Sequence, residues 1–117
     1  MMDQLEFKLL GRIDAPSVCP EQWVRKAETY RDVVRLAWTL RRAKGAKAVD
    51  LARHCEFHAQ HVSDWLAMDD KPKRRSLPAH HIPAFEDFVG NTLVSQWLAR
   101  HAQLTVLEEI TATKAAA

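Results

Sequence analysis

Glycine is scarce in this sequence of 117 residues, which contains three glycines. A glycine-rich loop that would wrap a phosphate group therefore has no candidate. The two cysteines, Cys19 and Cys55, lie far apart, and we expect both to be reduced thiols. No apolar run reaches the roughly 18 residues of a membrane-spanning helix, and the first residues lack a run long enough for a secretory signal. We therefore expect a soluble, cytoplasmic protein.

An excess of charge of one sign is also missing. The chain has 17 Lys and Arg against 15 Asp and Glu, a net charge of +2, which is too small to indicate nucleic acid by itself. The distribution is more informative, because nine of the basic residues and only five of the acidic ones fall between positions 41 and 75. The 47% of hydrophobic residues is enough for the core of one domain.

The stretch from residue 48 to residue 66 has the pattern of two short helices joined by a tight corner. Apolar residues such as Leu51 and Trp65 recur at helical spacing on both sides of a polar break at residues 56–58. This pattern is typical of a helix-turn-helix, whose second helix lays its polar face in the DNA major groove. We expect that helix at about residues 59–67. The residues on its exposed face are Ala59, Gln60, Ser63 and Asp64.

Gln60 is the residue on this face that is best suited to read a base. Its amide can donate to and accept from adenine at the same time. Ser63 can reach a base or a phosphate, whereas Asp64 can accept from cytosine or else orient a neighbouring cation. These four side chains are therefore the expected base-reading set.

The residues around the motif resemble the lambda-repressor/Cro (Xre-like) helix-turn-helix family. That family has a Leu-Arg pair and a Lys-Gly stop before the motif, an alanine in its first helix and a Val-Ser pair in its second. The matching residues are Leu40 with Arg41, Lys44 with Gly45, Leu51 with Ala52, and Val62, Ser63, Asp64 and Trp65. Where the family has glycine at the corner, with positive φ, this sequence has Glu56.

The resemblance implies an all-α, lambda-repressor-like five-helix domain and a small, prophage-type regulator that binds double-stranded DNA. Residues 77–90 are similar to the extra helix of such regulators, whereas the first twenty residues have no counterpart in the family. Phosphate contacts are expected from two groups of cations that flank the motif. They are Arg41, Arg42, Lys44 and Lys47 before it, and Lys71, Lys73, Arg74 and Arg75 after it.

Each group of cations has a structural explanation as well. The pattern predicts one helix from Glu21, with Pro20 at its first position, to about Lys44, ended by Gly45. Cations in its last turn would complement the helix dipole. The cations of the polar loop 68–76 would then form a solvated face.

Residues 1–20 form a segment apart from residues 21–117, which we expect to fold as the DNA-binding domain. Leu5, Phe7 and Leu9 alternate with polar residues and are followed by turn residues. We expect an extended arm whose apolar residues fold back on the core, the alternative being an arm that contacts DNA.

The remaining residues predict a short turn at 78–81, a helix from about Pro83 that ends at Gly90, and a long helix capped by Asn91. The long helix should run from residue 92 to about 111, with residues 112–117 frayed. Its second half is longer than such a domain needs, which favours a homodimer, the alternative being packing against the N-terminal arm. The expected dimer interface consists of Trp97, His101, Leu104, Leu107 and Ile110.

The sequence patterns for metal binding and for catalysis are weaker than the pattern for a helix-turn-helix. His54 and His58 have an i, i+4 spacing that can hold zinc on a continuous helix, but the corner of the motif should separate them. Cys55 with a nearby histidine suggests a nucleophile pair, yet a small buried residue is expected there. We therefore expect no cofactor, no metal and no enzymatic activity.

The sequence predicts a transcriptional regulator that occupies a short DNA operator as a dimer. The alternative is a protein-interaction scaffold, antitoxin-like or a phage regulatory partner, in which the C-terminal helix binds another protein.

Overall fold

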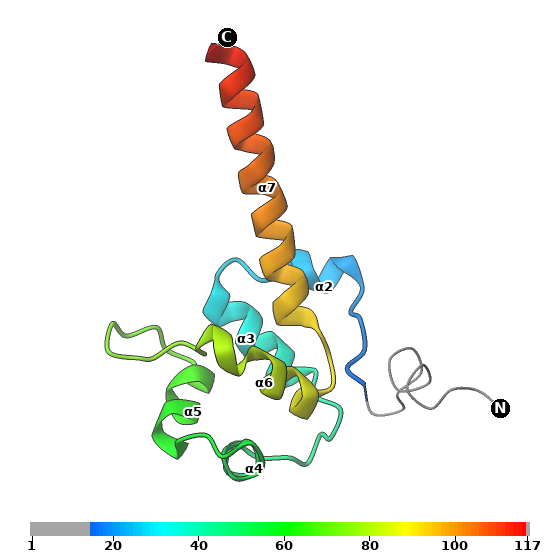
Figure 1. Ribbon diagram of the computed structural model, residues 1–117. Coiled ribbons are helices and arrows are strands. Elements are labelled where there is room, and N and C mark those ends of the chain that lie inside the picture. Colours follow the sequence, from blue (N-terminus) through cyan, green and yellow to red (C-terminus); the bar gives the residue numbers. More distant parts are fainter. Residues whose placement is uncertain (1–14, 117) are drawn as a thin grey trace, which may run out of the picture.

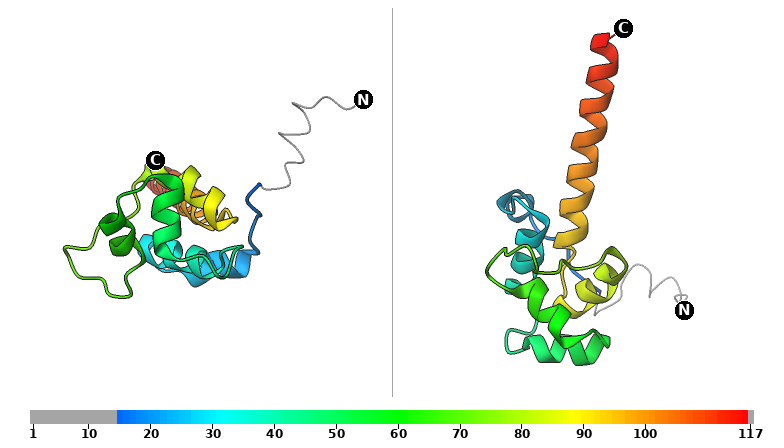
Figure 2. Two further views of the ribbon diagram at one scale, coloured as in Figure 1. Left: turned by 90° about the horizontal axis from the view of Figure 1, so that it is seen from below. Right: turned by 90° about the vertical axis from the view of Figure 1, so that its left-hand side faces the viewer.

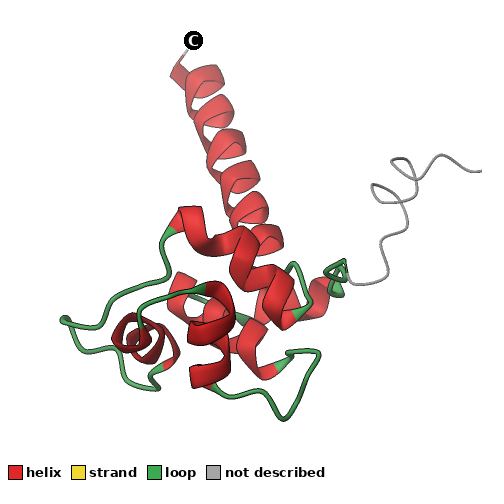
Figure 3. Cartoon of the chain, turned by 60° about the horizontal axis from the view of Figure 1, so that its bottom comes forward, coloured by secondary structure: helices red, strands yellow, loops and turns green. Residues whose placement is uncertain are grey.

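The residues that the structure describes form helices joined by loops. The structure, a computed structural model, describes residues 15–116, with side chains at all of these positions except 104, 105 and 114–116. Within that range the backbone forms helices and loops, apart from one isolated β-bridge between Ser17 and Asn91 (Figure 3). The all-α expectation is confirmed.

Six α-helices and one short 3-10 helix make up the described part of the chain. They are α2 (Glu21–Lys26), α3 (Tyr30–Thr39), α4 (Ala48–Cys55), α5 (Ala59–Leu66), η1 (Ala79–His81), α6 (Ile82–Val89) and α7 (Leu93–Ala116). Figure 1 shows α2 to α6 gathered in a body from which α7 extends. The helix α3 packs against α5, α6 and α7, and α4 packs against α5 and α6.

The single helix expected from Glu21 to Lys44 is wrong, because two helices occupy this stretch. The break follows from a capping box: the Thr29 hydroxyl accepts from the Asp32 N–H at 3.1 Å, and the Asp32 carboxylate accepts from the Thr29 N–H at 3.2 Å. The second helix then ends at Thr39, well before Gly45. Pro20 is the N-cap of α2, one position before the first helical residue.

The core lies between α3, α5, α6 and the beginning of α7. Its largest fully buried side chains are Trp65, Phe85, Leu51, Leu93, Val24, Val33, Val34, Val62, Val89 and Val94. Most come from positions that recur every three or four residues, so each short helix presents one apolar face to the centre. The body is therefore held by several helices that individually are too short to be stable alone.

The predictions for residues 78–91 are confirmed. A short 3-10 turn covers Ala79–His81, and α6 begins next to Pro83. Gly90 ends α6 with φ 82°. The Asn91 side chain accepts from the Leu93 N–H at 3.2 Å and donates to the Ala37 carbonyl at 3.1 Å, so it caps α7 and ties it to α3.

Only the first turns of α7 belong to the core. Leu93 and Val94 are fully buried, and Trp97 is 8% exposed with its indole N–H donating to the Ala27 carbonyl at 3.0 Å. Trp97 was expected at a dimer interface, and this is wrong because the side chain packs inside its own chain. Beyond it, Figure 2 shows α7 rising away from the body.

The helix α7 is longer than predicted. It continues to Ala116, so residues 112–116, which were expected to fray, are helical. No helix in the described range is long and apolar enough to cross a membrane.

The segment before α2 runs along the junction of α6 and α7. The Ser17 N–H donates to the Gly90 carbonyl at 2.9 Å, and the Thr92 N–H donates to the Ser17 carbonyl at 3.0 Å. The Gln96 side chain makes a matching pair of hydrogen bonds with the Cys19 backbone, both 2.9 Å. The expected docking of the apolar residues 5, 7 and 9 concerns positions outside the described range.

Candidate nucleic-acid interface

Glu56 forms the corner between α4 and α5. Its backbone is left-handed, with φ 58° and ψ 36°, a conformation that costs an L-residue roughly 1–2 kcal/mol. The N–H groups of Glu56 and Phe57 both donate to the Ala52 carbonyl, as in helices that end on a left-handed residue. The prediction that Glu56 adopts the positive φ of this corner is confirmed.

Packing inside the corner fixes the angle between α4 and α5. The Phe57 ring meets the Trp65 ring edge-on, with 5.3 Å between centroids, and Leu51 and Val62 are fully buried beside them. The Trp65 indole N–H is buried without an acceptor among the described residues. The two helices therefore act as one rigid unit rather than as independent turns.

Three of the four residues expected to read bases are exposed at the start of α5. Ala59, Gln60 and Ser63 all face solvent, and His58 caps the helix by accepting from the Gln60 N–H at 3.3 Å. The free N–H groups of the first turn give this end of α5 a positive partial charge. A polar, uncovered helix start of this kind is suited to approach a polyanion.

The fourth residue, Asp64, does not lie on the exposed face, and that expectation is wrong. Its carboxylate is 5% exposed and accepts hydrogen bonds from Arg74 at 3.1 Å and from Arg75 at 3.2 Å. Burial would raise the pKa of Asp64, but the hydrogen bonds from both arginines outweigh it, and the pKa is lowered overall. Asp64 therefore orients neighbouring cations, the alternative role that the sequence left open, and its charge is compensated.

Arg31 of α3 is the residue that fastens the end of α5, and sequence analysis missed it. Its guanidinium donates to the backbone carbonyls of Asp64, Ala67, Asp69 and Arg75, at 2.9, 3.3, 3.2 and 2.7 Å. These include carbonyl groups at the end of α5, which lack partners inside the helix. The sequence did contain one signal for this role. Arg31 and Arg35 lie four residues apart, on the same side of a helix and next to its apolar stripe.

Arg35 completes this connection between α3 and the loop after α5. It donates to the Ala67 carbonyl at 2.9 Å and forms ion pairs with Asp32 at 2.6 Å and Asp70 at 2.9 Å. Arg31 also meets Asp70, at 3.0 Å. Thus the acidic residues of the loop are neutralised from inside the protein, which leaves its lysines as the outward charge.

The cations before the motif lie in the loop between α3 and α4 rather than in a last helical turn. Arg41 stacks over the Trp38 ring at 4.4 Å and donates to the carbonyls of Lys44 and Ala46. Arg42 donates to the Ala15 carbonyl at 2.8 Å, and Lys44 donates to the Thr39 carbonyl at 3.2 Å. The expected position of these cations in the last helical turn is wrong, yet Arg41 and Lys44 still donate to carbonyls at the C-terminal end of α3, those of Trp38 at 3.0 Å and Thr39 at 3.2 Å. Arg42 and Lys44 are exposed, whereas Arg41 is partly buried.

The cations after the motif divide into two kinds. Arg74 pairs with Asp69 at 2.8 Å and with Asp64 at 3.1 Å, and Arg75 pairs with Asp64 at 3.2 Å, so both arginines hold the loop. Lys71 and Lys73 are exposed and form no ion pair within the described part of the chain. In Figure 1 the loops before and after the α4 and α5 pair lie on opposite sides of it. Lys44 and Lys47, in the segment before α4, are exposed as well.

Four histidines gather next to the corner. The rings of His58 and His61 stack at 4.5 Å, and those of His80 and His81 lie 4.0 Å apart, with His81 against Phe57 at 4.6 Å. His54 and His58 belong to different helical segments, as expected. Among the described residues no group of three His, Cys, Asp or Glu side chains could hold a metal ion.

The environment of Cys55 favours the protonated thiol. Burial raises its pKa, and the negative charge of Asp87 raises it further. Its Sγ lies 3.7 Å from the Ala84 carbonyl. A nucleophilic cysteine needs the opposite, a pKa lowered by nearby cations.

In comparisons with known proteins, no protein-family model, no curated protein and no solved structure matches this chain.

Proposed function

We propose that this protein is a sequence-specific DNA-binding transcriptional regulator of prophage type, with a lambda-repressor-like fold, that inserts α5 into the major groove. The observation that carries the proposal is the α4–corner–α5 unit, in which the left-handed Glu56 and buried Trp65 hold an uncovered, polar helix start. A helix of this kind, braced by a preceding one, fits the major groove.

The charge around α5 supports the same role. Asp64, Asp69 and Asp70 are neutralised by arginines of the protein itself, so the acidic residues of this region do not oppose a phosphate backbone. Lys71 and Lys73 remain exposed on the loop that follows α5. They are better candidates for phosphate contacts than Arg74, whose guanidinium already serves two carboxylates.

Base reading is assigned to Gln60, with Ser63 and Ala59 beside it. The Gln60 amide nitrogen approaches the Asp64 carboxylate at 3.5 Å, beyond the usual length of a strong hydrogen bond, so the amide can turn to a base edge at little cost. Gln60→Ala should reduce discrimination against a mismatched base by about 1–3 kcal/mol at one position of the site.

The test is a titration of labelled duplex DNA followed by fluorescence anisotropy at two salt concentrations, after selection of a preferred sequence from a random pool. Lys73→Ala should weaken binding to every sequence alike and lower the salt slope by about one. Gln60→Ala should instead flatten the preference for the selected sequence while keeping the salt slope.

Matched controls lie on α2, which is remote from α5 in Figure 1. Lys26→Ala removes the same charge as Lys73→Ala, and Gln22→Ala removes the same amide as Gln60→Ala; both should bind as the wild type does. Folded protein that binds no duplex at low salt would refute the proposal. Equal effects of the α2 and α5 variants would refute the assigned surface.

A further inference from the structure

Among the residues that the structure describes, no other element covers the outer part of α7. Near the point where α7 leaves the body, Arg100 forms an ion pair with Glu21, and the His101 ring lies tilted against the Trp97 ring, 3.9 Å between centroids. Beyond them the described side chains are exposed, among them Val106 at 52%, Leu107 at 59% and Ile110 at 47%. The stretch 101–116 extends roughly 24 Å at about 1.5 Å per residue.

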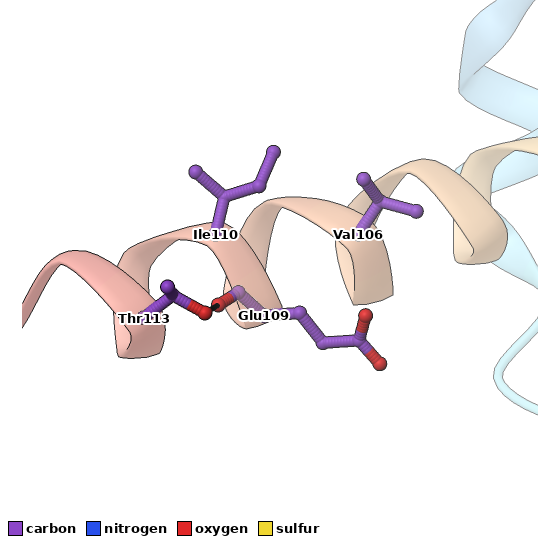
Figure 4. Close-up of a pocket in the computed structure, with 4 residues that line it drawn as sticks. All are labelled: Val106, Glu109, Ile110 and Thr113. Carbon is purple, nitrogen blue, oxygen red and sulfur yellow. Dashed lines mark hydrogen bonds between the residues drawn. The ribbon is translucent and has the colours of Figure 1, made fainter. Parts of the chain in front are cut away.

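In proteins most of the stability of a helix comes from packing of its apolar face, and the described side chains of this stretch have no such packing. Exposed apolar side chains also come singly on most surfaces rather than in a row. On α7 they form a row, along which two shallow depressions meet at Val106. The first is lined by Ala102, Gln103, Val106 and Leu107, and the second by Val106, Glu109, Ile110 and Thr113. Figure 4 shows Val106 and Ile110 pointing to the same side of α7.

The spacing along this row is that of a coiled-coil seam. Steps of three and four connect Gln103, Val106, Ile110 and Thr113, which is the alternation of a and d positions. Gln103 and Ile110 then occupy a, and Val106 and Thr113 occupy d. Gln103 is a polar residue at an a position. Such a residue fixes the register of the helices and the number of strands, although it lowers the stability of the coiled coil.

The flanking charges in this register are self-complementary for a parallel pair. Glu109 falls at g and Lys114 at the next e, five residues on, the spacing at which parallel helices form salt bridges between chains. In an antiparallel pair g meets g and e meets e, so Glu109 would face Glu109. The charges therefore favour a second copy in parallel orientation over an antiparallel one.

We propose that two copies of this chain pair through residues 102–116 of α7 as a short parallel coiled coil. This interface differs from the one that the sequence predicts, because Trp97 is buried in its own body and Val106 takes the central position. The proposal stands on α7 alone and does not depend on DNA binding.

A parallel pair also has a consequence for α5. In Figures 1 and 2 the α4 and α5 pair lies at the end of the body opposite to the free end of α7. Parallel pairing keeps both bodies at the same end of the stalk, with both α5 helices turned away from it. Two recognition helices can then meet one duplex at neighbouring half-sites.

The test is sedimentation equilibrium of the full chain without DNA, at loading concentrations that span about two decades in the micromolar range. The wild type should form a dimer, and Ile110→Glu, which puts two like charges into the seam, should raise the dimer Kd more than about tenfold. Thr111→Glu is the matched control, since it adds the same charge at an exposed position outside the row; it should leave the Kd within about twofold.

Charge reversal tests the orientation. Glu109→Lys should weaken the dimer, and the double variant Glu109→Lys with Lys114→Glu should restore it, because the opposite charges meet again between g and e. Both positions lie on the outer stretch of α7, far along the chain from its buried first turns, so each variant should melt as the wild-type body does at low concentration. A monomer at every concentration, a dimer that Ile110→Glu leaves intact, or equal affinity of all the charge variants would overturn the proposal, whether or not the protein binds DNA.

Discussion

The Arg31 side chain forms hydrogen bonds with five other residues, and none of them is close to it in sequence. The side chain is 14% exposed, and its guanidinium donates to four backbone carbonyls that are 33 to 44 residues away. Hydrogen bonds from a charged donor contribute about 1.5–3 kcal/mol each at best, and three of these four are partly buried, whereas the one to the Arg75 carbonyl is exposed. Contacts of this kind cannot be read from local patterns, which explains why the sequence predicted Asp64 as exposed and gave Arg31 no role.

Arg31→Met should therefore lower the free energy of unfolding by about 2–4 kcal/mol, because methionine retains the apolar stem and removes every donor. Urea unfolding followed by tryptophan fluorescence measures this change. Arg25→Met on α2 is the matched control: Arg25 is 66% exposed and only faces Glu21 at 3.6 Å, so its loss should change stability by less than about 1 kcal/mol. Equal effects of the two substitutions would contradict the role given to Arg31.

At the scale of helices, the pattern of residues predicted starts and ends where a capping residue or a special backbone conformation marked them. Gly90 and Asn91 gave the junction of α6 and α7 correctly, and the polar break at 56–58 gave the corner. The break between α2 and α3 was missed although Thr29 and Asp32 have the spacing of a capping box. The continuous apolar stripe through 21–44 outweighed this local signal, because two helices that pack on one core share a stripe.

Glu56 provides a test of the corner between α4 and α5. Glutamate in the left-handed region is strained, whereas glycine adopts it freely, so Glu56→Gly should raise stability by about 0.5–1 kcal/mol. Thermal unfolding of the variant measures the gain.

Gly90→Ala is the opposite case and serves as the comparison. Its φ is +82°, and an added Cβ would lie 2.8 Å from the Arg42 Nε atom, so this substitution should destabilise the protein. A loss of stability in Glu56→Gly would mean that the Glu56 side chain contributes more to the corner than its backbone strain takes away.

The whole molecule is a body that carries two chemically different ends: the exposed start of α5 and the free stretch of α7. The sequence predicted the existence of both ends, through the polar face of the motif and the length of the last helix. It could not predict how the charges of the body are distributed, since the pairing of Asp64, Asp69 and Asp70 with arginines of α3 and the loop depends on the tertiary fold. The protonation of these three carboxylates therefore depends on tertiary contacts, and the pH dependence of stability tests those contacts.

Histidine titration should produce a first loss of stability on acidification. Partial burial lowers the pKa of His61, and nearby Arg75 and His58 lower it further; burial likewise lowers the pKa of His81, with smaller effects of His80 and His61. Because the folded state holds these histidines below their usual pKa of about 6.5, the unfolded chain takes up protons first. Stability is then full above that pH and falls as the pH drops through it.

Carboxylate titration should produce a second loss at lower pH. Hydrogen bonds from Arg74 lower the pKa of Asp69 to about 2, and hydrogen bonds from Arg35 and Arg31 lower that of Asp70. Groups whose folded pKa is depressed stabilise the protein above their unfolded pKa, near 4, and lose this contribution as the pH falls toward 2. Melting temperatures measured at intervals from pH 8 to pH 2 should fall in two steps; His61→Gln should reduce the first step and Asp69→Asn the second. A melting temperature that stays constant down to pH 4 would contradict the lowered pKa values of His61 and His81. An unchanged second step in Asp69→Asn would show that the ion pair with Arg74 does not help to hold the loop.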